Sequence, residues 1–255
     1  MPTDEIIIRL FCIVDDRLAA VKKHPLAKLY PSEVVTIGLL FALKGRTYRA
    51  FYRWLQANYG PLFPRLPEQS RLYRVLVNAH AYTDQFLADP TILGIIDSFG
   101  IELLHPRREG RSTTPLGKKG ISNHRWIVGI KLAWLINQRG EVVEWSWLPA
   151  NVSDQEFREV VAWQAGHTIA LGDRGFRVRA DEDDGVPIKI CGRGDWNCRF
   201  LIETTFRLLE RVFQIKKLTH RTARGMDMRL GFVAACFNAL LQLTNGRLSF
   251  LDFVI

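Results

Sequence analysis

The sequence predicts an α/β fold built on a mixed β-sheet, preceded by an all-α domain. Three observations lead to this prediction. Apolar residues recur at helical spacing up to about Pro90, and strand-like segments alternate with helical ones beyond it. The 255 residues are 47% hydrophobic and 24% charged, which is the balance of a globular protein with a substantial core. We therefore expect two domains, at residues 1–90 and 91–255.

The first domain is predicted to contain several short helices. One spans about 32–45, between a serine cap and a glycine stop, and a second spans about 47–60. A third begins at Ser70 and carries Arg71 and Arg74. Short helices joined by tight turns, with arginines on the last one, indicate a helix-turn-helix-like module that binds DNA. A plain helical bundle has the same pattern, so both interpretations stay open.

The second domain is predicted to contain five strands and a basic loop at 105–124. The strands are expected at about 92–103, 126–136, 142–148, 167–171 and 186–191. A turn at residues 137–140 joins the second strand to the third, and the capping pattern Ser153-x-x-Glu156 opens a helix before the fourth. Two further helices are expected at about 199–213 and 227–243.

The order of these elements favours one arrangement of the sheet. A strand followed by two hairpin-linked strands, a crossover helix and a fourth strand is the ribonuclease-H-like arrangement. In this arrangement the first and fourth strands lie side by side. Asp97 lies in the first strand and Asp173 just after the fourth, so both reach one site near the carboxyl ends of adjacent strands.

Three carboxylates are the candidate catalytic residues. Asp97 interrupts an apolar strand, where a buried carboxylate is costly unless it is paired or bound to a cation; a solvent-facing strand position is the alternative. Asp173 lies in a sequence that is also typical of an ordinary turn, and Glu203 lies on a helix with an apolar stripe. Together they supply hard oxygen ligands for two-metal phosphoryl transfer, with Mg²⁺ as the expected ion and Mn²⁺ as a substitute. Asp154 is attributed to helix capping instead.

The positive charge predicts a polyanionic partner. Lys and Arg number 35 against 26 Asp and Glu, which gives a net charge of +9. Basic residues gather at 105–125 and 199–229, a pattern typical of phosphate-binding surfaces. The candidates for DNA contact in these stretches are Lys118, Lys119, Arg199 and Arg207. Trp196 is a candidate for stacking on an unpaired base, with a core or interface position as its alternative.

Nothing in the sequence predicts export or membrane insertion. No apolar run approaches about 18 residues, and the apolar stretch near the start lacks a basic leader and a small-residue cleavage site. The four cysteines show no CxxC spacing, so neither a zinc site nor a disulfide framework is indicated. We expect a cytoplasmic protein with reduced thiols.

Four segments, in this order, resemble the DDE transposases of bacterial insertion sequences. They are Ile96-Asp97-Ser98, Gly117–Gly120 with Gly129–Leu132, Leu171–Phe176, and Arg199-x3-Glu203-Thr204-Thr205-Phe206. The resemblance spans about residues 92–243. In addition, Gln69-Ser70-Arg71-x-x-Arg74 resembles the helical head of one insertion-sequence group.

The resemblance implies a magnesium-dependent enzyme that nicks DNA at transposon ends and joins the freed 3′-hydroxyl to target DNA. Its acidic triad would be Asp97, Asp173 and Glu203. Its partner would be double-stranded DNA, and the pairing of two transposon ends implies a homodimer or a larger assembly. Such an enzyme would be bacterial and associated with the nucleoid.

The sequence matches one family signature only in part, and two alternatives stay open. In the Tyr-x2-Arg-x3-Glu-x6-Lys signature of some of these enzymes, Trp196 stands at the Tyr position and Glu210 at the Lys position. A DNA-binding protein derived from a transposase, without catalysis, is therefore one alternative. A ribonuclease-H-like nuclease that cleaves DNA without strand transfer is another.

Overall fold

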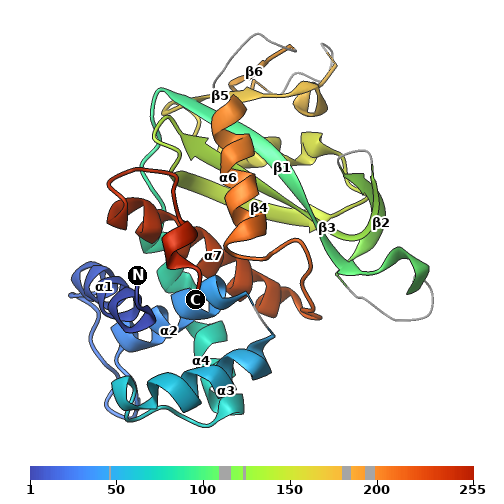
Figure 1. Cartoon of the computed structure of the whole chain (residues 1–255). Coiled ribbons are helices and arrows are strands. Elements are labelled where there is room, and N and C mark those ends of the chain that lie inside the picture. Colours follow the sequence, from blue (N-terminus) through green and yellow to red (C-terminus); the bar gives the residue numbers. More distant parts are fainter. Residues whose placement is uncertain (46, 109–115, 123–124, 180–184, 193–198) are drawn as a thin grey trace. The chain divides into compact units, whose positions relative to one another are not determined.

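A computed structural model describes the chain except residues 46, 109–115, 123–124, 180–184 and 193–198. The described residues form two compact units (Figure 1). The helical unit comprises Met1–Phe86, Arg211–Gln214 and Ala223–Ile255, and the sheet unit comprises Leu87–Glu210 and Ile215–Thr222. No helix in the described parts of the chain is long and apolar enough to cross a membrane.

The helical unit is built around two helices that are buried over most of their surface. Its α-helices are α1 (Thr3–Arg17), α2 (Pro31–Lys44), α3 (Tyr48–Tyr59), α4 (Gln69–Ala79) and α7 (Ala223–Leu243), with 3-10 helices η1 (Gly60–Leu62), η2 (His80–Phe86) and η7 (Leu251–Phe253). Helices α2 and α7 are apolar on nearly all sides, which is typical of helices at the centre of a bundle. They pack closely at Gly38, where a Cβ would lie within 2.2 Å of the Phe232 ring.

The compact units divide the chain differently from the predicted boundary near residue 90. Residues 223–255 were assigned to the second domain, but α7 belongs to the helical unit. The physical reason is that α7 has apolar side chains all round, and the N-terminal helices supply the surface that buries them. The functions assigned to the two domains stay predictions.

The sheet unit holds a mixed sheet of six strands. They are β1 (Leu93–Leu104), β2 (Lys118–Ser122), β3 (Arg125–Asn137), β4 (Val142–Pro149), β5 (Ile169–Gly172) and β6 (Ile188–Ile190), in the order β2-β3-β1-β5-β6 with β4 also paired to β3. β3 is antiparallel to both β1 and β4, whereas β1, β5 and β6 are parallel. The five predicted strands are all present, and the first and fourth predicted strands, β1 and β5, are neighbours.

One strand was not predicted. β2 falls in the segment 105–124 that was expected to be a loop, which also contains the short helix η3 (Pro106–Arg108). β2 pairs with 125–129 of β3, whereas β4 pairs with 130–136, so the two share one edge of β3. Lys118 and Lys119 are exposed, and β2 therefore lacks the apolar alternation by which a strand is detected.

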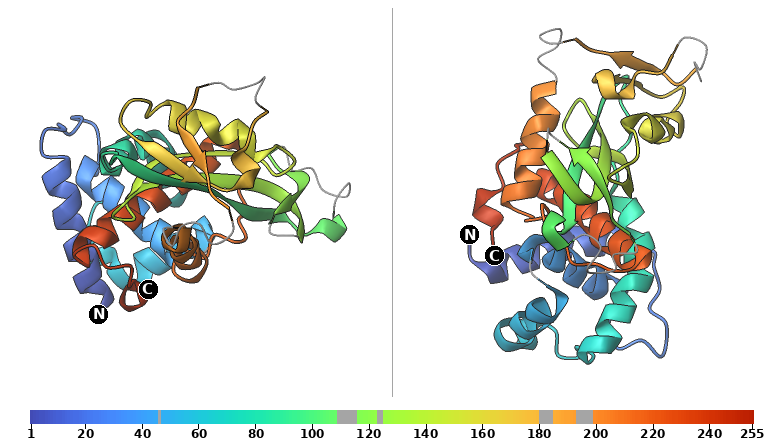
Figure 2. Two further views of the ribbon diagram at one scale, coloured as in Figure 1. Left: turned by 90° about the horizontal axis from the view of Figure 1, so that it is seen from above. Right: turned by 90° about the vertical axis from the view of Figure 1, so that its right-hand side faces the viewer.

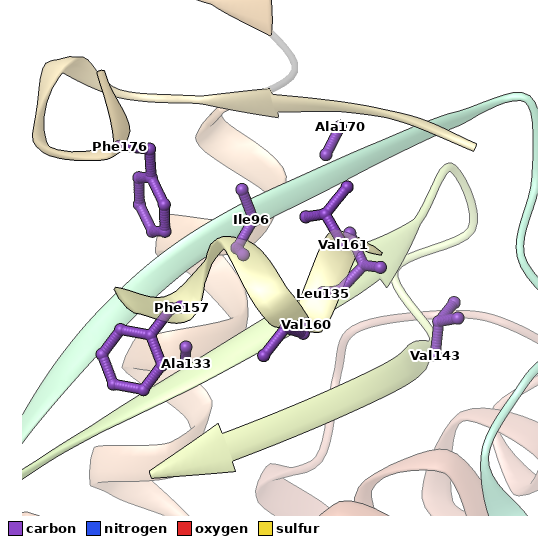
Figure 3. Packing of buried hydrophobic residues seen from close by; sticks show 9 residues of the cluster. All are labelled: Ile96, Ala133, Leu135, Val143, Phe157, Val160, Val161, Ala170 and Phe176. Atoms are coloured by element: carbon purple, nitrogen blue, oxygen red, sulfur yellow. The ribbon is translucent and has the colours of Figure 1, made fainter. Parts of the chain in front are cut away.

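Helices cover both faces of the sheet (Figure 2). On one face lies α6 (Arg199–Arg211), whose Phe206 ring meets the Phe99 ring of β1 with 5.4 Å between centroids. On the other face lie η4 (Asp154–Phe157) and α5 (Arg158–Ala162). Their apolar side chains form a buried cluster with residues of β1, β3, β4, β5 and η5 (Arg174–Phe176), as Figure 3 shows.

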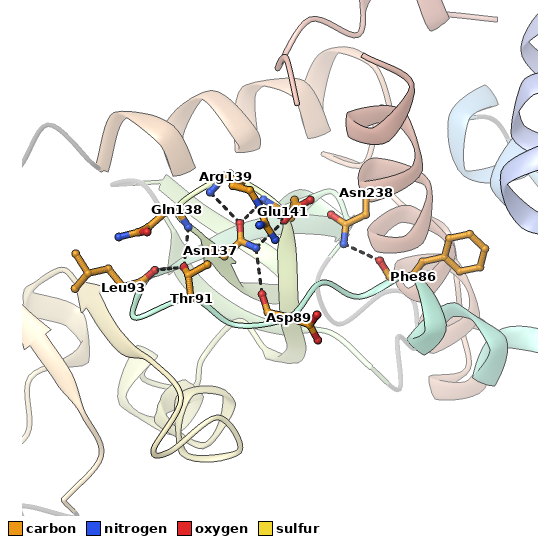
Figure 4. Close-up of polar contacts among 9 residues, drawn as sticks. All are labelled: Phe86, Asp89, Thr91, Leu93, Asn137, Gln138, Arg139, Glu141 and Asn238. Atoms are coloured by element: carbon orange, nitrogen blue, oxygen red, sulfur yellow. Dashed lines mark hydrogen bonds and ion pairs between the residues drawn. The ribbon is translucent and has the colours of Figure 1, made fainter. Parts of the chain in front are cut away.

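Each unit also has buried polar contacts (Figure 4). In the helical unit, Asn238 of α7 donates to the Phe86 carbonyl at 2.8 Å. In the sheet unit, fully buried Asn137 ends β3 at the predicted turn. Its Nδ2 donates to the Asp89 carbonyl at 3.2 Å and to Glu141 at 2.8 Å, and its Oδ1 accepts from the amides of Arg139 and Glu141. This side chain thus fastens the β3–β4 turn to the segment before β1.

We expect Asn137→Ala to destabilise the sheet unit by about 2–3 kcal/mol, because it removes the four hydrogen bonds of a buried side chain. Thermal unfolding followed by circular dichroism should show a fall in Tm of about 5–10 °C. Gln138→Ala is the matched control, because the hydrogen bond of Gln138 to Thr91 uses its backbone amide. Equal Tm values for the two variants would contradict the role given to Asn137.

Candidate active site

Asp97 lies in the middle of β1 and is half-buried. Side chains alternate between the two faces of a strand, so Asp97 lies on the same face as Phe99, which contacts α6. Its Oδ1 accepts a hydrogen bond from the Ser98 amide at 2.7 Å. The strand therefore carries this carboxylate toward α6.

Asp173 follows the end of β5 and is also half-buried. It caps η5, where its Oδ1 accepts from the Gly175 amide at 2.8 Å. The parallel pairing matches Ile95 with Leu171. Asp97 and Asp173 each lie two residues further along, so they stand at the same level of adjacent strands, which run about 4.8 Å apart.

Glu203 lies on α6 and is exposed. Because residues three and four positions apart share a helix face, Glu203, Arg207 and Glu210 lie on one side of α6. All three line a pocket of about 430 Å³ together with Asp97, Ser98, Phe99, Asp173 and Phe206. The structure thus places the three predicted carboxylates around one pocket.

The carboxylates do not form a closed cluster. Within the described part of the chain, no three His, Cys, Asp or Glu side chains are grouped closely enough to hold a metal ion as they stand. The titratable pocket residues other than Arg207 offer only oxygen donors, from Asp97, Asp173, Glu203 and Glu210. An all-oxygen set suits Mg²⁺ or Mn²⁺ better than zinc, which prefers nitrogen and sulfur ligands.

The predicted DNA-binding residues lie in several places. Lys118 and Lys119 are exposed on β2, and the Lys119 ammonium lies 5.5 Å from the centre of the exposed Trp126 ring. Arg207 is exposed at the pocket. In the helical unit, Arg71 and Arg74 are exposed on α4. Trp196 lies outside the described residues, and Arg199 begins α6.

Glu210 is paired with a basic side chain. The Lys216 ammonium donates to both carboxylate oxygens of Glu210, at 2.9 and 3.0 Å. Lys216 comes from the segment after α6, which is fastened to β1 because the Glu102 amide donates to the Lys216 carbonyl. A lysine is therefore present beside the pocket-lining Glu210, although α6 itself carries none.

Three residues near the pocket were not singled out as functional by the sequence. Ser98 donates to Asp154 Oδ1 at 2.9 Å, and Lys131 of β3 donates to the same oxygen at 3.0 Å. The capping role predicted for Asp154 is taken by Ser153, whose hydroxyl accepts from the Gln155 amide. Lys131 could have revealed this cluster in the sequence, because a lone lysine in an apolar strand needs a buried polar partner.

Part of the chain matches a known protein family. Residues 87–182 match a family model described as a transposase DDE domain. The matched segment includes Asp97 and Asp173 and ends before Glu203. Searches of curated proteins and of solved structures found no match. The match confirms the resemblance drawn from the sequence, because residues 87–182 are similar to a transposase DDE domain.

Proposed function

We propose that this protein is a DNA transposase that nicks the ends of an insertion sequence and joins the freed 3′-hydroxyl to target DNA. The carrying observation is that Asp97, Asp173 and Glu203 line one polar pocket of a chain with a transposase DDE domain. Such a domain implies an enzyme of the polynucleotidyl transferase type. In the proposal these three side chains form its acidic triad.

The sheet supports a ribonuclease-H-like catalytic domain. Without β2, its strand order is β4-β3-β1-β5-β6, with three antiparallel strands followed by two parallel ones. The crossover between β4 and β5 contains η4 and α5, and α6 covers the opposite face. This is the arrangement expected from the order of elements in the sequence.

The triad would hold Mg²⁺, for which Mn²⁺ could substitute. When bound, these ions would activate the attacking hydroxyl and neutralise charge on the leaving oxygen. Asp97 provides a carboxylate from β1, Asp173 provides one from the turn after β5, and exposed Glu203 provides one from α6. Arg207, on the same face of α6, would orient a DNA phosphate beside the triad through its guanidinium.

The DNA surface is proposed to extend beyond the pocket. Lys118 and Lys119 would contact phosphates, as would Arg199 at the start of α6, and Trp196 would stack on an unpaired base. The helical unit is proposed as a helix-turn-helix-like head that uses Arg71 and Arg74. Two copies of the chain would hold the two transposon ends.

The proposed function is tested with labelled duplex DNA carrying the ends of the element that encodes the chain. The wild-type protein is incubated with this DNA and a target plasmid in Mg²⁺ or Mn²⁺, and products are separated on denaturing gels. Cleaved ends together with joined products support the transposase. Cleavage without joining would favour the nuclease, and binding without cleavage would favour a DNA-binding protein derived from a transposase.

The pairing of Glu210 with Lys216 weighs against a DNA-binding protein without catalysis. Glu210 at the usual Lys position puts the phosphate contact of α6, and with it the activity, in question. Lys216 compensates for it, since the ammonium contacts both Glu210 oxygens. We therefore favour the active enzyme.

We expect Lys119→Ala to weaken DNA binding equally for all sequences, because a lysine on a phosphate contributes charge and no base readout. The slope of log K against log salt concentration should fall in magnitude by about 0.9. Fluorescence anisotropy at several salt concentrations measures this slope. Lys189→Ala removes the same charge from β6, at the opposite edge of the sheet, and should leave the slope unchanged. Equal slopes for the wild type and Lys119→Ala would exclude the contact.

A further inference from the structure

A chain of polar contacts connects three segments of the sheet unit. Lys131 of β3 donates to Asp154 Oδ1 at 3.0 Å and to the Val152 carbonyl at 2.9 Å. The Ser98 hydroxyl of β1 donates to the same Asp154 oxygen at 2.9 Å. The Lys131 side chain is only 10% exposed and that of Asp154 25%. Asp154 therefore joins β1, β3 and the start of η4 through one carboxylate.

The Asp154 carboxylate lies next to the two residues whose amides donate to Asp97 and Asp173. On one side, Ser98 donates through its hydroxyl to Asp154 and through its amide to Asp97. On the other side, Gly175 donates its amide to Asp173. A Cβ on Gly175 would lie 3.0 Å from Asp154 Oδ2 and 2.9 Å from Asp173 Oδ1. The turn that holds Asp173 is therefore packed directly against Asp154.

The segment around Asp154 is fastened to the same turn at further points. Arg158, which is buried, donates to the Phe176 carbonyl at 3.0 Å, and the Gln155 side chain donates to the Arg177 carbonyl. Apolar packing adds to these bonds, because Phe157 and Phe176 belong to the buried cluster of Figure 3. Ile96, which precedes Asp97, lies in that cluster too. The η4–α5 segment is thus attached to the neighbours of both Asp97 and Asp173.

We propose that Asp154 is a positioning residue that holds Asp97, through Ser98, and Asp173, through the Gly175 turn, in the relative placement that a divalent cation requires. Stability is a poor explanation for the Lys131–Asp154 pair, because desolvating two charges costs about as much as their attraction returns. Its geometric consequence is specific, since the oxygen shared by Lys131 and Ser98 fixes the carboxylate. The inference rests on the proposed function, in which Asp97 and Asp173 bind the cation.

The decisive variant is Ser98→Ala, which removes the link to Asp154 and leaves the Lys131–Asp154 pair intact. Mn²⁺ affinity of the full chain without DNA is measured by electron paramagnetic resonance, and DNA cleavage is measured at saturating DNA. We expect both to fall by about tenfold, the usual effect of removing a residue that orients a metal ligand. DNA affinity should be unchanged. Ser98→Thr, which keeps a hydroxyl and suits a strand, should restore both. Asp154→Asn should reproduce the loss.

Glu141→Gln is the structural control, because Glu141 also makes side-chain bonds to its neighbours but at the far end of β3. It should lower Tm without changing Mn²⁺ affinity. Unchanged Mn²⁺ affinity in Ser98→Ala overturns the inference, as does a wild type that binds no Mn²⁺. A wild type that binds Mn²⁺ but neither cleaves nor joins DNA overturns the proposed function, and the Mn²⁺ affinities of the variants still decide the role of Asp154. If Asp154→Asn does not fold, Ser98→Ala and Ser98→Thr decide it.

Discussion

Asp97→Asn is expected to reduce DNA cleavage and joining by at least about 10³-fold. The substitution keeps the size of the side chain but removes the charge that would hold a divalent cation. Loss of a metal ligand removes several kcal/mol of transition-state stabilisation, and about 4 kcal/mol corresponds to this factor. Cleavage of labelled transposon ends at saturating DNA and Mg²⁺ measures the rate. DNA binding should not weaken, because the change removes a negative charge from the pocket.

Two further substitutions serve as controls for Asp97→Asn. Glu159→Gln removes an exposed carboxylate from α5, outside the pocket, and should leave the rate unchanged. Glu203→Gln should match Asp97→Asn, and the double variant should be no slower than either, because residues that act as one unit are not additive. A rate within tenfold of the wild type for Asp97→Asn, in a folded protein, would refute the triad.

Arg229→Ala is expected to destabilise the helical unit by about 3 kcal/mol or more. Arg229 lies on α7, is 1% exposed, and its guanidinium donates to the carbonyls of Phe41 and Ala42 near the C-terminal end of α2. A cation beside these last carbonyls of α2 also stabilises the helix dipole. Burial lowers the pKa of Arg229 to about 10, so it is still charged at neutral pH.

Thermal unfolding should show a fall in Tm of about 6–12 °C for Arg229→Ala. Arg224→Ala, on the exposed first turn of the same helix, should change stability by less than about 0.5 kcal/mol. Arg229→Met separates volume from hydrogen bonding, because it fills most of the space but offers no donor. A Tm equal to that of the wild type for Arg229→Met would show that the side chain acts through packing alone.

Local patterns in the sequence predicted most helices and strands, and they predicted that Asp97 and Asp173 lie on neighbouring strands. The apolar runs of β1 and β3 and the alternating side chains of β4 identify these strands, and the residue types at 137–140 identify the turn. The order of elements then placed β1 beside β5, and with them Asp97 beside Asp173. These inferences succeeded because period and order are properties of the chain itself.

Other features depended on contacts between distant segments. β2 forms because β4 pairs only with residues 130–136 of β3, which leaves residues 125–129 on the same edge to pair with β2. α7 joins the N-terminal helices because they supply the apolar surface that it needs.

The sequence by itself determined the mixed α/β sheet, the carboxylates on adjacent strands and the resemblance to DDE transposases. Only the tertiary structure decided that Lys216 neutralises Glu210 and that Asp154 meets Ser98 and Lys131. In each case the partners lie outside one another's helix or strand, so no periodicity within an element relates them. Partners 23 and 56 residues away from Asp154 share no periodicity with it, and only the packing of β1, β3 and η4 brings their polar atoms within bonding distance.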